Sequence, residues 1–168
     1  QKRQLALQLK KLNKRRHGAF VVVHRQTGLC LTIEGGFKVR GARVVLQKCR
    51  DYAEQAWSWR KDNLRSALSG YCLRIKNGVL KLGAAAVVDT CLDAPAQLNL
   101  VKSERWRIGV HLEIQSQLSK KCLMPRGKKL GSGSPVLMWQ CRKPWAPLQW
   151  NIRTITVIKA PPRMGFAW

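Results

Sequence analysis

The sequence predicts an all-β domain built from three copies of one small unit. Six cysteines fall into three successive pairs, and the two members of every pair stand 19 residues apart. Each copy opens with Cys-Leu, has a glycine a few residues later and carries an apolar run before its second cysteine. Such self-similarity is the signature of a repeat architecture. The pairs are Cys30 and Cys49, Cys72 and Cys91, and Cys122 and Cys141.

Four short strands are predicted in the first copy, at 20–24, 29–33, 44–48 and 56–59. These runs are rich in β-branched and aromatic residues, and the turn signals "TG", "EGG" and "RG" separate them. Three units of about four strands and roughly 40 to 50 residues predict a pseudo-threefold β-trefoil. A three-bladed propeller is the competing geometry, but propellers typically have about four to eight blades.

We place the trefoil at residues 18–158, with repeats at about 18–60, 61–102 and 106–155. Residues 1–17 are then a basic N-terminal extension and 159–168 a C-terminal extension. Tryptophan follows the second cysteine of the first and third copies, whereas Leu98 takes that place in the second. The tryptophans predicted to lie in the core are Trp57, Trp59, Trp106 and Trp150.

Disulfides within each copy are the predicted pairing of the cysteines. A bond that closes a loop of this length contributes about 3 kcal/mol in the chain-entropy model, which helps to offset the repulsion among the positive charges. Six free thiols or metal ligation are the alternatives. The chain has no Cys-x-x-Cys and only three histidines, so we expect neither a metal site nor a cofactor. Disulfides imply an oxidising compartment, so the chain is expected to be secreted or to lie on the extracellular side of a membrane.

The charge of the chain is strongly positive. Lysine and arginine number 32 against eight acids, which gives a formal net charge of +24. Such a charge attracts polyanions, among them sulfated glycans, nucleic acids and anionic membranes. The basic residues gather in the predicted loops, most densely in "SKKCLMPRGKKLGSGS" at 119–134. Its candidate binding residues are Lys120, Lys121, Arg126, Lys128 and Lys129.

The N-terminal extension, residues 1–17, allows two interpretations. Leu5, Leu9 and Leu12 share one face of a possible helix whose other positions are largely basic. Such a helix docks on an acidic protein or an anionic membrane. The alternative is a basic segment without fixed structure, because propensity alone rarely holds so short a helix in water. The chain begins at Gln1 and has neither a signal-peptide pattern nor an apolar run long enough for a membrane helix, which leaves open a processed chain or a fragment.

A family resemblance rests on the residues after each second cysteine. "EQAW" at 54–57 holds a Gln-x-Trp, and "AQL" at 96–98 and "LQW" at 148–150 are degenerate versions of it. With Cys-Leu opening each unit, this pattern resembles the ricin-type β-trefoil lectins. The stretches "WSWRKDNLRSALSGYCLRI" and "FVVVHRQTGLCLTI" are similar to the N-terminal cysteine-rich domain of the mannose receptor family. The resemblance covers roughly residues 18 to 158.

The resemblance implies where a sugar would bind. Galactose-binding ricin-type repeats carry an aspartate two residues after the first cysteine, but Thr32, Arg74 and Met124 stand there, so no ordinary galactose site is expected. The mannose receptor domain instead binds sulfated N-acetylgalactosamine in its third repeat, with a tryptophan stacked on the sugar. "LMWQCRKPWAPLQW" occupies that region here.

The candidate stacking residue in that region is Trp145, with Arg142 and Lys143 beside the anion. The alternative is that Trp145 only caps the barrel.

Two functions therefore remain open from the sequence. The chain has no nucleophile elbow, no His-Glu-x-x-His and no phosphate-binding glycine loop, so we expect no enzyme. The resemblance and the charge favour a non-catalytic, lectin-like module for sulfated or other anionic glycans. The alternative is a structural or interaction subunit that docks onto an acidic protein, an anionic membrane or nucleic acid. No base-reading motif is present, so sequence-specific binding of nucleic acid is not expected.

Overall fold

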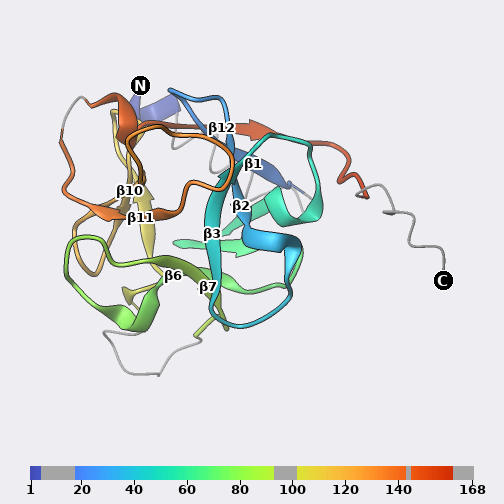
Figure 1. The fold of residues 1–168 in the computed structure, drawn as a ribbon, viewed down its shortest axis with the longest axis horizontal. Coiled ribbons are helices and arrows are strands. Elements are labelled where there is room, and N and C mark those ends of the chain that lie inside the picture. Colours follow the sequence, from blue (N-terminus) through green and yellow to red (C-terminus); the bar gives the residue numbers. More distant parts are fainter. Residues whose placement is uncertain (5–17, 93–101, 143–144, 161–168) are drawn as a thin grey trace.

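A computed structural model describes residues 1–4, 18–92, 102–142 and 145–160 (Figure 1). Within these residues the chain forms short strands and single turns of 3-10 helix, apart from a helical turn at 2–4, so the all-β prediction is confirmed. The strands are β1 Phe20–His24, β2 Cys30–Ile33, β3 Ala42–Gln47, β4 Trp57–Arg60, β5 Asn63–Ser66, β6 Cys72–Ile75, β7 Ala86–Asp89, β8 Trp106–Ile108, β9 Ile114–Ser116, β10 Cys122–Pro125, β11 Val136–Trp139 and β12 Trp150–Thr154. The 3-10 turns are η1 Glu34–Gly36, η2 Ala53–Gln55, η3 Lys76–Gly78 and η4 Ala146–Leu148.

The first and fourth strands of each repeat form a barrel. Antiparallel pairs join β1 to β12, β4 to β5 and β8 to β9, and Phe20 of β1 faces Trp57 of β4. In the second and third repeats the contact equivalent to Phe20–Trp57 is a single backbone hydrogen bond. These bonds run from Trp106 N to Asp62 O (2.8 Å) and from Trp150 N to Leu112 O (2.9 Å). The same join therefore recurs in all three repeats, as a pseudo-threefold β-trefoil requires.

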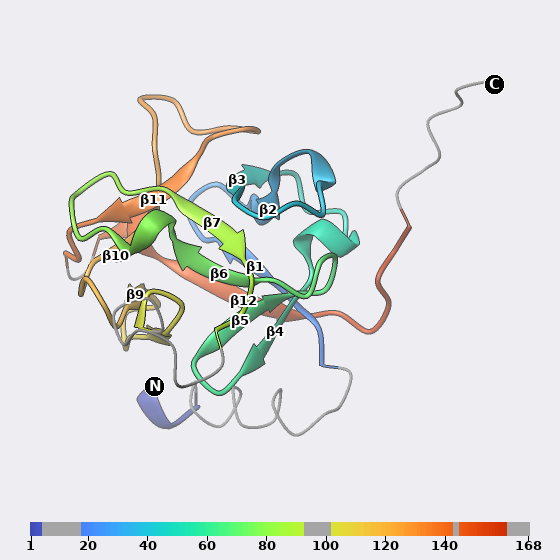
Figure 2. The same cartoon turned by 90° about the horizontal axis from the view of Figure 1, so that it is seen from below.

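The second and third strands of each repeat form hairpins that cover one end of the barrel. These are β2–β3, β6–β7 and β10–β11, each with a four-residue register. In Figure 2 the hairpin strands lie above the barrel strands. A glycine near the end of each hairpin loop donates its N–H to the neighbouring hairpin. The bonds are Gly41 to Val88 O (2.8 Å), Gly83 to Met138 O (2.8 Å) and Gly133 to Leu46 O (2.7 Å).

Three buried tryptophans join the barrel to the hairpins. Each indole Nε1–H donates to the carbonyl of the leucine that follows the first cysteine of its own repeat. The bonds run from Trp57 to Leu31 (3.1 Å), from Trp106 to Leu73 (2.9 Å) and from Trp150 to Leu123 (3.2 Å). All three indoles are buried, and Trp59 also packs in the main core, so the prediction of core tryptophans is confirmed.

The three disulfides pair as predicted, each within one repeat. Cys30 joins Cys49, Cys72 joins Cys91, and Cys122 joins Cys141, with Cα–Cα distances of 5.1, 5.1 and 5.2 Å. The first cysteine of each pair is buried at the start of the second strand. Each bond ties that strand to the segment that leaves the hairpin.

The second repeat corrects the sequence prediction. Trp106, and not Leu98, is the counterpart of Trp57, and Glu104 takes the buried place of Gln55 two residues earlier. Glu104 accepts a hydrogen bond from Leu92 N (2.9 Å), as Gln55 does from Arg50 N (2.7 Å). The repeat therefore extends through β8 to Ile108 and does not end at residue 102.

The error follows from chain length. The connection between the second cysteine and the tryptophan is longer here than in the other two repeats. The "AQL" at 96–98 lies outside the described residues, as does the whole of 93–101.

Most of the two predicted extensions lies outside the described residues. The amphipathic pattern at 5–17 belongs to that part, so its helix stays a prediction, as does the last segment, 161–168. The described start of the chain, Gln1 and Gln4, lies in a hollow with His111 and Gln149 of the barrel loops. The C-terminal extension begins beside the first repeat, where Lys159 N donates to Asp51 O (2.8 Å).

Replacing Lys120 with glycine is expected to stabilise the fold by about 0.5 to 1 kcal/mol. Lys120 has a φ of +60° in the β9–β10 turn, where the other two repeats have Gly28 (+71°) and Gly70 (+73°). A side chain is strained in this conformation. Equilibrium unfolding in urea measures the change.

Gly70→Ala is the reciprocal control, because an added Cβ at Gly70 meets nothing within 4 Å and isolates the backbone strain. The free energy of unfolding of this variant is expected to fall by a similar amount, about 0.5 to 1 kcal/mol. A destabilised Lys120→Gly would show that the lysine side chain makes a contact worth more than the strain.

Candidate anion-binding pocket in the third repeat

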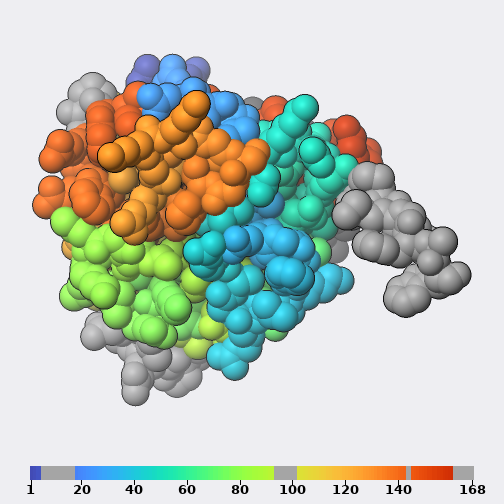
Figure 3. All heavy atoms as spheres, in the orientation of Figure 1, coloured from blue at the N-terminus to red at the C-terminus, as the bar shows by residue number. Residues whose placement is uncertain are grey.

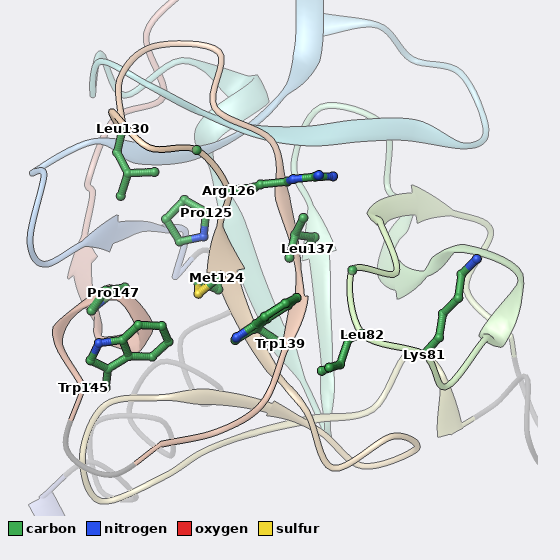
Figure 4. A pocket seen from close by; sticks show the side chains of 12 residues that line it. Lys81, Leu82, Met124, Pro125, Arg126, Leu130, Leu137, Trp139, Trp145 and Pro147 are labelled. Carbon is green, nitrogen blue, oxygen red and sulfur yellow. The ribbon is translucent and has the colours of Figure 1, made fainter.

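A pocket of about 560 Å³ opens between the second and third repeats. The β10–β11 hairpin forms one wall, the β6–β7 loop another and the segment before β12 a third. Its lining residues are Lys81, Leu82, Gly83, Met124, Pro125, Arg126, Gly127, Leu130, Leu137, Trp139, Trp145 and Pro147 (Figure 4). No acidic residue is among them.

Aromatic and apolar side chains line the centre of the pocket, and cations lie at its rim. In Figure 4 Met124 lies between the indoles of Trp145 and Trp139. Arg126 extends over Leu137 at one rim, and Lys81 points outward at another. A flat apolar centre with cations around it suits a ligand that has a ring face and an anionic group.

Arg142 adds a cation directly at the tryptophan. Its guanidinium carbon lies 5.5 Å from the centroid of the Trp145 ring, within the range of a cation–π contact. The Trp145 side chain is half-buried while Arg142 is exposed. The contact therefore holds a guanidinium group, with its planar set of donors, at the edge of the aromatic wall.

The three positions where galactose-binding repeats carry aspartate have other roles here. Thr32 is buried, and its hydroxyl donates to Cys30 O (2.8 Å) and accepts from Gln55 Nε2 (3.2 Å). Arg74 donates to Thr90 O (3.1 Å), and Met124 lines the pocket. None of them offers a carboxylate to sugar hydroxyls.

Two contacts hold the walls of the pocket in place. Gly83 N donates to Met138 O of β11, which fixes the β6–β7 loop against the third repeat. His24 of β1 donates from Nε2 to Pro147 O (3.0 Å), and its ring packs edge-on against Trp150 at 5.0 Å. The segment that carries Trp145 is therefore anchored to the barrel.

His24 makes the stability of the fold depend on pH. Burial lowers the pKa of His24 below its ordinary value of 6.5, and the bond to Pro147 O only partly opposes this shift. The folded state therefore binds the proton less readily than the unfolded chain. The stabilisation is complete above pH 6.5 and is lost as the pH falls below it towards the lowered pKa.

We expect the free energy of unfolding in urea to be smaller at pH 5 than at pH 7.5, since this interval includes the ordinary pKa of histidine, about 6.5. His24→Gln has no titrating group at this position, and its stability should change less over the same interval. An equal pH dependence in both proteins would show that His24 is not responsible.

The predicted site residues are only partly brought together. Arg126 and Trp145 line the pocket and Arg142 touches Trp145, while Lys128 and Lys129 lie exposed on the same β10–β11 loop. Lys120 and Lys121 precede β10 at its other end and do not line the pocket. Lys143 lies outside the described residues.

Lys81 and Leu82 of the second repeat line the pocket but were not among the predicted site residues. The signal was available in principle, because each unit of a closed repeat structure packs on its neighbour.

Most acids of the described chain are engaged and leave the positive charge uncompensated. Asp89 pairs with Arg40 (2.7 Å), and Asp51 pairs with Arg153 (2.8 Å). Glu104 and Glu113 are buried. Among the described residues no group of three or more His, Cys, Asp or Glu side chains is arranged to hold a metal ion, and no helix is long and apolar enough to cross a membrane.

The comparison with known families agrees with this architecture. The model of the ricin-type β-trefoil lectin domain matches residues 18–154, which is most of the chain. The chain belongs to this family. The ricin-type repeats account for the Cys-Leu and Gln-x-Trp pattern and for the three hairpins on a barrel. No curated protein matches the chain in sequence.

Solved structures of other proteins share the fold of this chain at low sequence identity. The designed threefold-symmetric protein ThreeFoil has a TM-score of 0.71 at 18% identity, covering 82% of this chain and 99% of its own. The C-half of an earthworm R-type lectin, solved with GalNAc, has a TM-score of 0.65 at 14% identity (82% and 99%). The agglutinin of Abrus precatorius has a TM-score of 0.68 at 19% identity, and the match covers 83% of this chain and 50% of the agglutinin.

Proposed function

We propose that this chain is a non-catalytic, lectin-like module that binds a sulfated or otherwise anionic glycan in the third-repeat pocket. The observation that carries the proposal is the composition of that pocket: tryptophan at its wall, cations at its rim and no carboxylate in its lining. Neutral sugars are generally held by carboxylates and amides on their hydroxyls, whereas a sulfate needs cations and N–H donors. The family supports a sugar ligand in general, and related structures were solved with GalNAc and with α-methyl-D-galactoside.

In this proposal each wall has a separate role. The Trp145 ring stacks on the apolar face of the sugar, and Arg142 and Arg126 hold the sulfate. Met124 replaces a hydrogen-bonding side chain with an apolar contact, so the sugar is oriented by its anionic group and not by paired hydroxyls. The likeness to the mannose receptor domain stays a prediction, and the pocket chemistry agrees with it.

A longer polyanion would extend over the hairpin loop. Lys128 and Lys129 follow Arg126 on the surface, and both side chains are exposed. Polyanion binding of this kind grows with the number of anionic groups neutralised and falls with salt. The three disulfides support a secreted or extracellular chain, where sulfated glycans occur.

Heparin affinity chromatography against a salt gradient tests the polyanion part of the proposal. We expect Arg126→Ala/Lys128→Ala/Lys129→Ala to elute at lower salt and to reduce the slope of log affinity against log salt by about 2 to 3. The matched control, Lys48→Ala/Arg50→Ala/Arg60→Ala, removes the same charge from exposed positions of the first repeat. It should elute closer to the wild type.

Equal losses in the two triple variants would assign heparin binding to net charge alone. Binding to a sulfated-glycan array is the second part of the test. Array signal for sulfated but not unsulfated glycans supports the lectin proposal. Elution at or below ordinary ionic strength without any array signal would favour the alternative, an interaction subunit that uses its charge on an acidic partner.

A further inference from the structure

Exposed apolar side chains are concentrated in two of the hairpin loops. Phe37 and Val39 in the β2–β3 loop are 61% and 55% exposed, and Leu80 in the β6–β7 loop is 56% exposed. Val79 and Leu82 are exposed beside Leu80. Two distant parts of the sequence thus present apolar groups to solvent at equivalent places in the repeat.

Both loops lie on the same face of the molecule. Figure 1 looks onto the three hairpins, and Figure 3 shows their loops, in blue to cyan, green and orange, on the side turned to the reader. Each loop is fixed by the bond from its glycine to the next hairpin, such as Gly41 N to Val88 O and Gly83 N to Met138 O. The apolar side chains are therefore held at the surface by a stable framework.

Phe37 is positioned by the glycine two residues before it. A Cβ at Gly35 would meet a ring carbon of Phe37 at 2.3 Å, and Gly35 has a φ of +68°. Only glycine leaves room for the ring to lie over the turn. The Phe37 ring lies over this glycine and is 61% exposed.

Cations alternate with these apolar groups. The loops read Phe-Lys-Val-Arg at 37–40 and Val-Leu-Lys-Leu at 79–82, and Lys128 and Lys129 occupy the third loop. Two nearby acids are already paired: Glu34 accepts from Arg43 (2.9 and 3.0 Å), and Asp89 accepts from Arg40 (2.7 Å). The hairpin face thus combines uncompensated positive charge with apolar tips.

We propose that the hairpin face docks onto an anionic phospholipid surface. The side chains of Phe37, Val39 and Leu80 enter the interfacial region, and Lys38 and Lys81 meet the headgroups. A polyanionic glycan would bind the cations of this face, but the exposed apolar side chains would add little to its binding free energy. A bilayer uses both, since apolar burial and attraction to anionic lipid add together. The tips stand on separate loops of one face, which fits a broad surface.

This docking goes beyond the proposed glycan function. The two share Lys81 at the pocket rim, and the apolar tips separate them. Phe37, Val39 and Leu80 do not line the third-repeat pocket, and Trp145 is not part of the hairpin loops. The described start of the chain lies at the opposite end of the molecule in Figure 2, beside the barrel loops.

Co-sedimentation of the full chain with vesicles tests the proposal. The vesicles contain phosphatidylcholine alone, or phosphatidylcholine and phosphatidylserine in equal amounts. We expect binding only to the second kind. Phe37→Ser/Leu80→Ser should reduce the partition coefficient at least about thirtyfold without changing heparin elution, because it removes no charge. The matched control, Val157→Ser/Ile158→Ser, alters two apolar residues elsewhere that are 66% and 43% exposed.

The outcomes separate the possible partners. The control should bind vesicles as the wild type does, and Trp145→Ala should also keep vesicle binding whatever it does to glycan binding. The proposal is overturned if the wild type ignores anionic vesicles, if the loop variant binds them unchanged, or if the control loses as much. Loss of binding to polyglutamate in the loop variant, with no vesicle binding by the wild type, would assign the face to an acidic protein instead.

Discussion

Trp106→Ala is expected to lower the free energy of unfolding by about 3 to 5 kcal/mol. The indole is fully buried in the main core, and its Nε1–H donates to Leu73 O at 2.9 Å. Its backbone N–H also closes the barrel through Asp62 O. Truncation leaves both a cavity and an unpaired buried carbonyl.

Three further variants separate the causes of this loss. Trp106→Phe keeps much of the ring volume but not the hydrogen bond, so we expect a cost of about 1 to 3 kcal/mol. Trp139→Ala alters a half-buried indole and should cost less than Trp106→Ala. Urea unfolding with the disulfides intact measures all of them. A greater loss for Leu98→Ala than for Trp106→Ala would restore the sequence-based choice of Leu98 as the counterpart of Trp57.

Trp145→Ala is expected to weaken binding of a sulfated sugar about thirtyfold, or about 2 kcal/mol. The residue supplies the aromatic wall of the third-repeat pocket and the platform for Arg142. Its loss removes the stacking surface and releases the guanidinium group from its position. Trp145→Phe should retain part of the affinity, because a smaller ring still stacks.

Calorimetric titration with 4-sulfated N-acetylgalactosamine measures this effect, and Arg60→Ala provides a surface control. The urea midpoint shows whether the fold is intact, since the anchor from His24 to Pro147 O does not involve the Trp145 side chain. An unchanged affinity in a folded Trp145→Ala protein would mean that this tryptophan only caps the barrel.

Much of the fold was predictable because the residues that recur in each repeat, above all the cysteines and tryptophans, also make its structural contacts. The cysteine spacing identified the three units, and the predicted strands of the first copy lie within two residues of β1 to β4. The fourth strand of the second repeat was missed. Spacing after Cys91 is longer than after the other cysteines, and Glu104 replaces the glutamine of the Gln-x-Trp pattern. That Glu104 is buried in the same place as Gln55 of the first repeat is evident only from the three-dimensional structure.

Only the pocket residues that come from the third repeat were predictable from the sequence. Trp145, Arg126 and Arg142 come from one continuous stretch, and the family pattern pointed to it. Lys81 and Leu82 come from the preceding repeat, and no local pattern joins them to that stretch. Contact across a repeat boundary depends on how the hairpins pack, which here is fixed by the bond from Gly83 to Met138.

The most direct test of the glycan-binding proposal is the NMR signal of the Trp145 indole N–H during titration with sulfated and unsulfated N-acetylgalactosamine. Trp145→Phe assigns the signal by its disappearance. We expect this resonance to shift progressively with the sulfated sugar and far less with the unsulfated one, while the signals of the buried indoles of Trp57 and Trp106 stay unchanged. Equal shifts with both sugars, or a Trp145 signal that stays fixed at saturating sulfated sugar, would contradict the proposal.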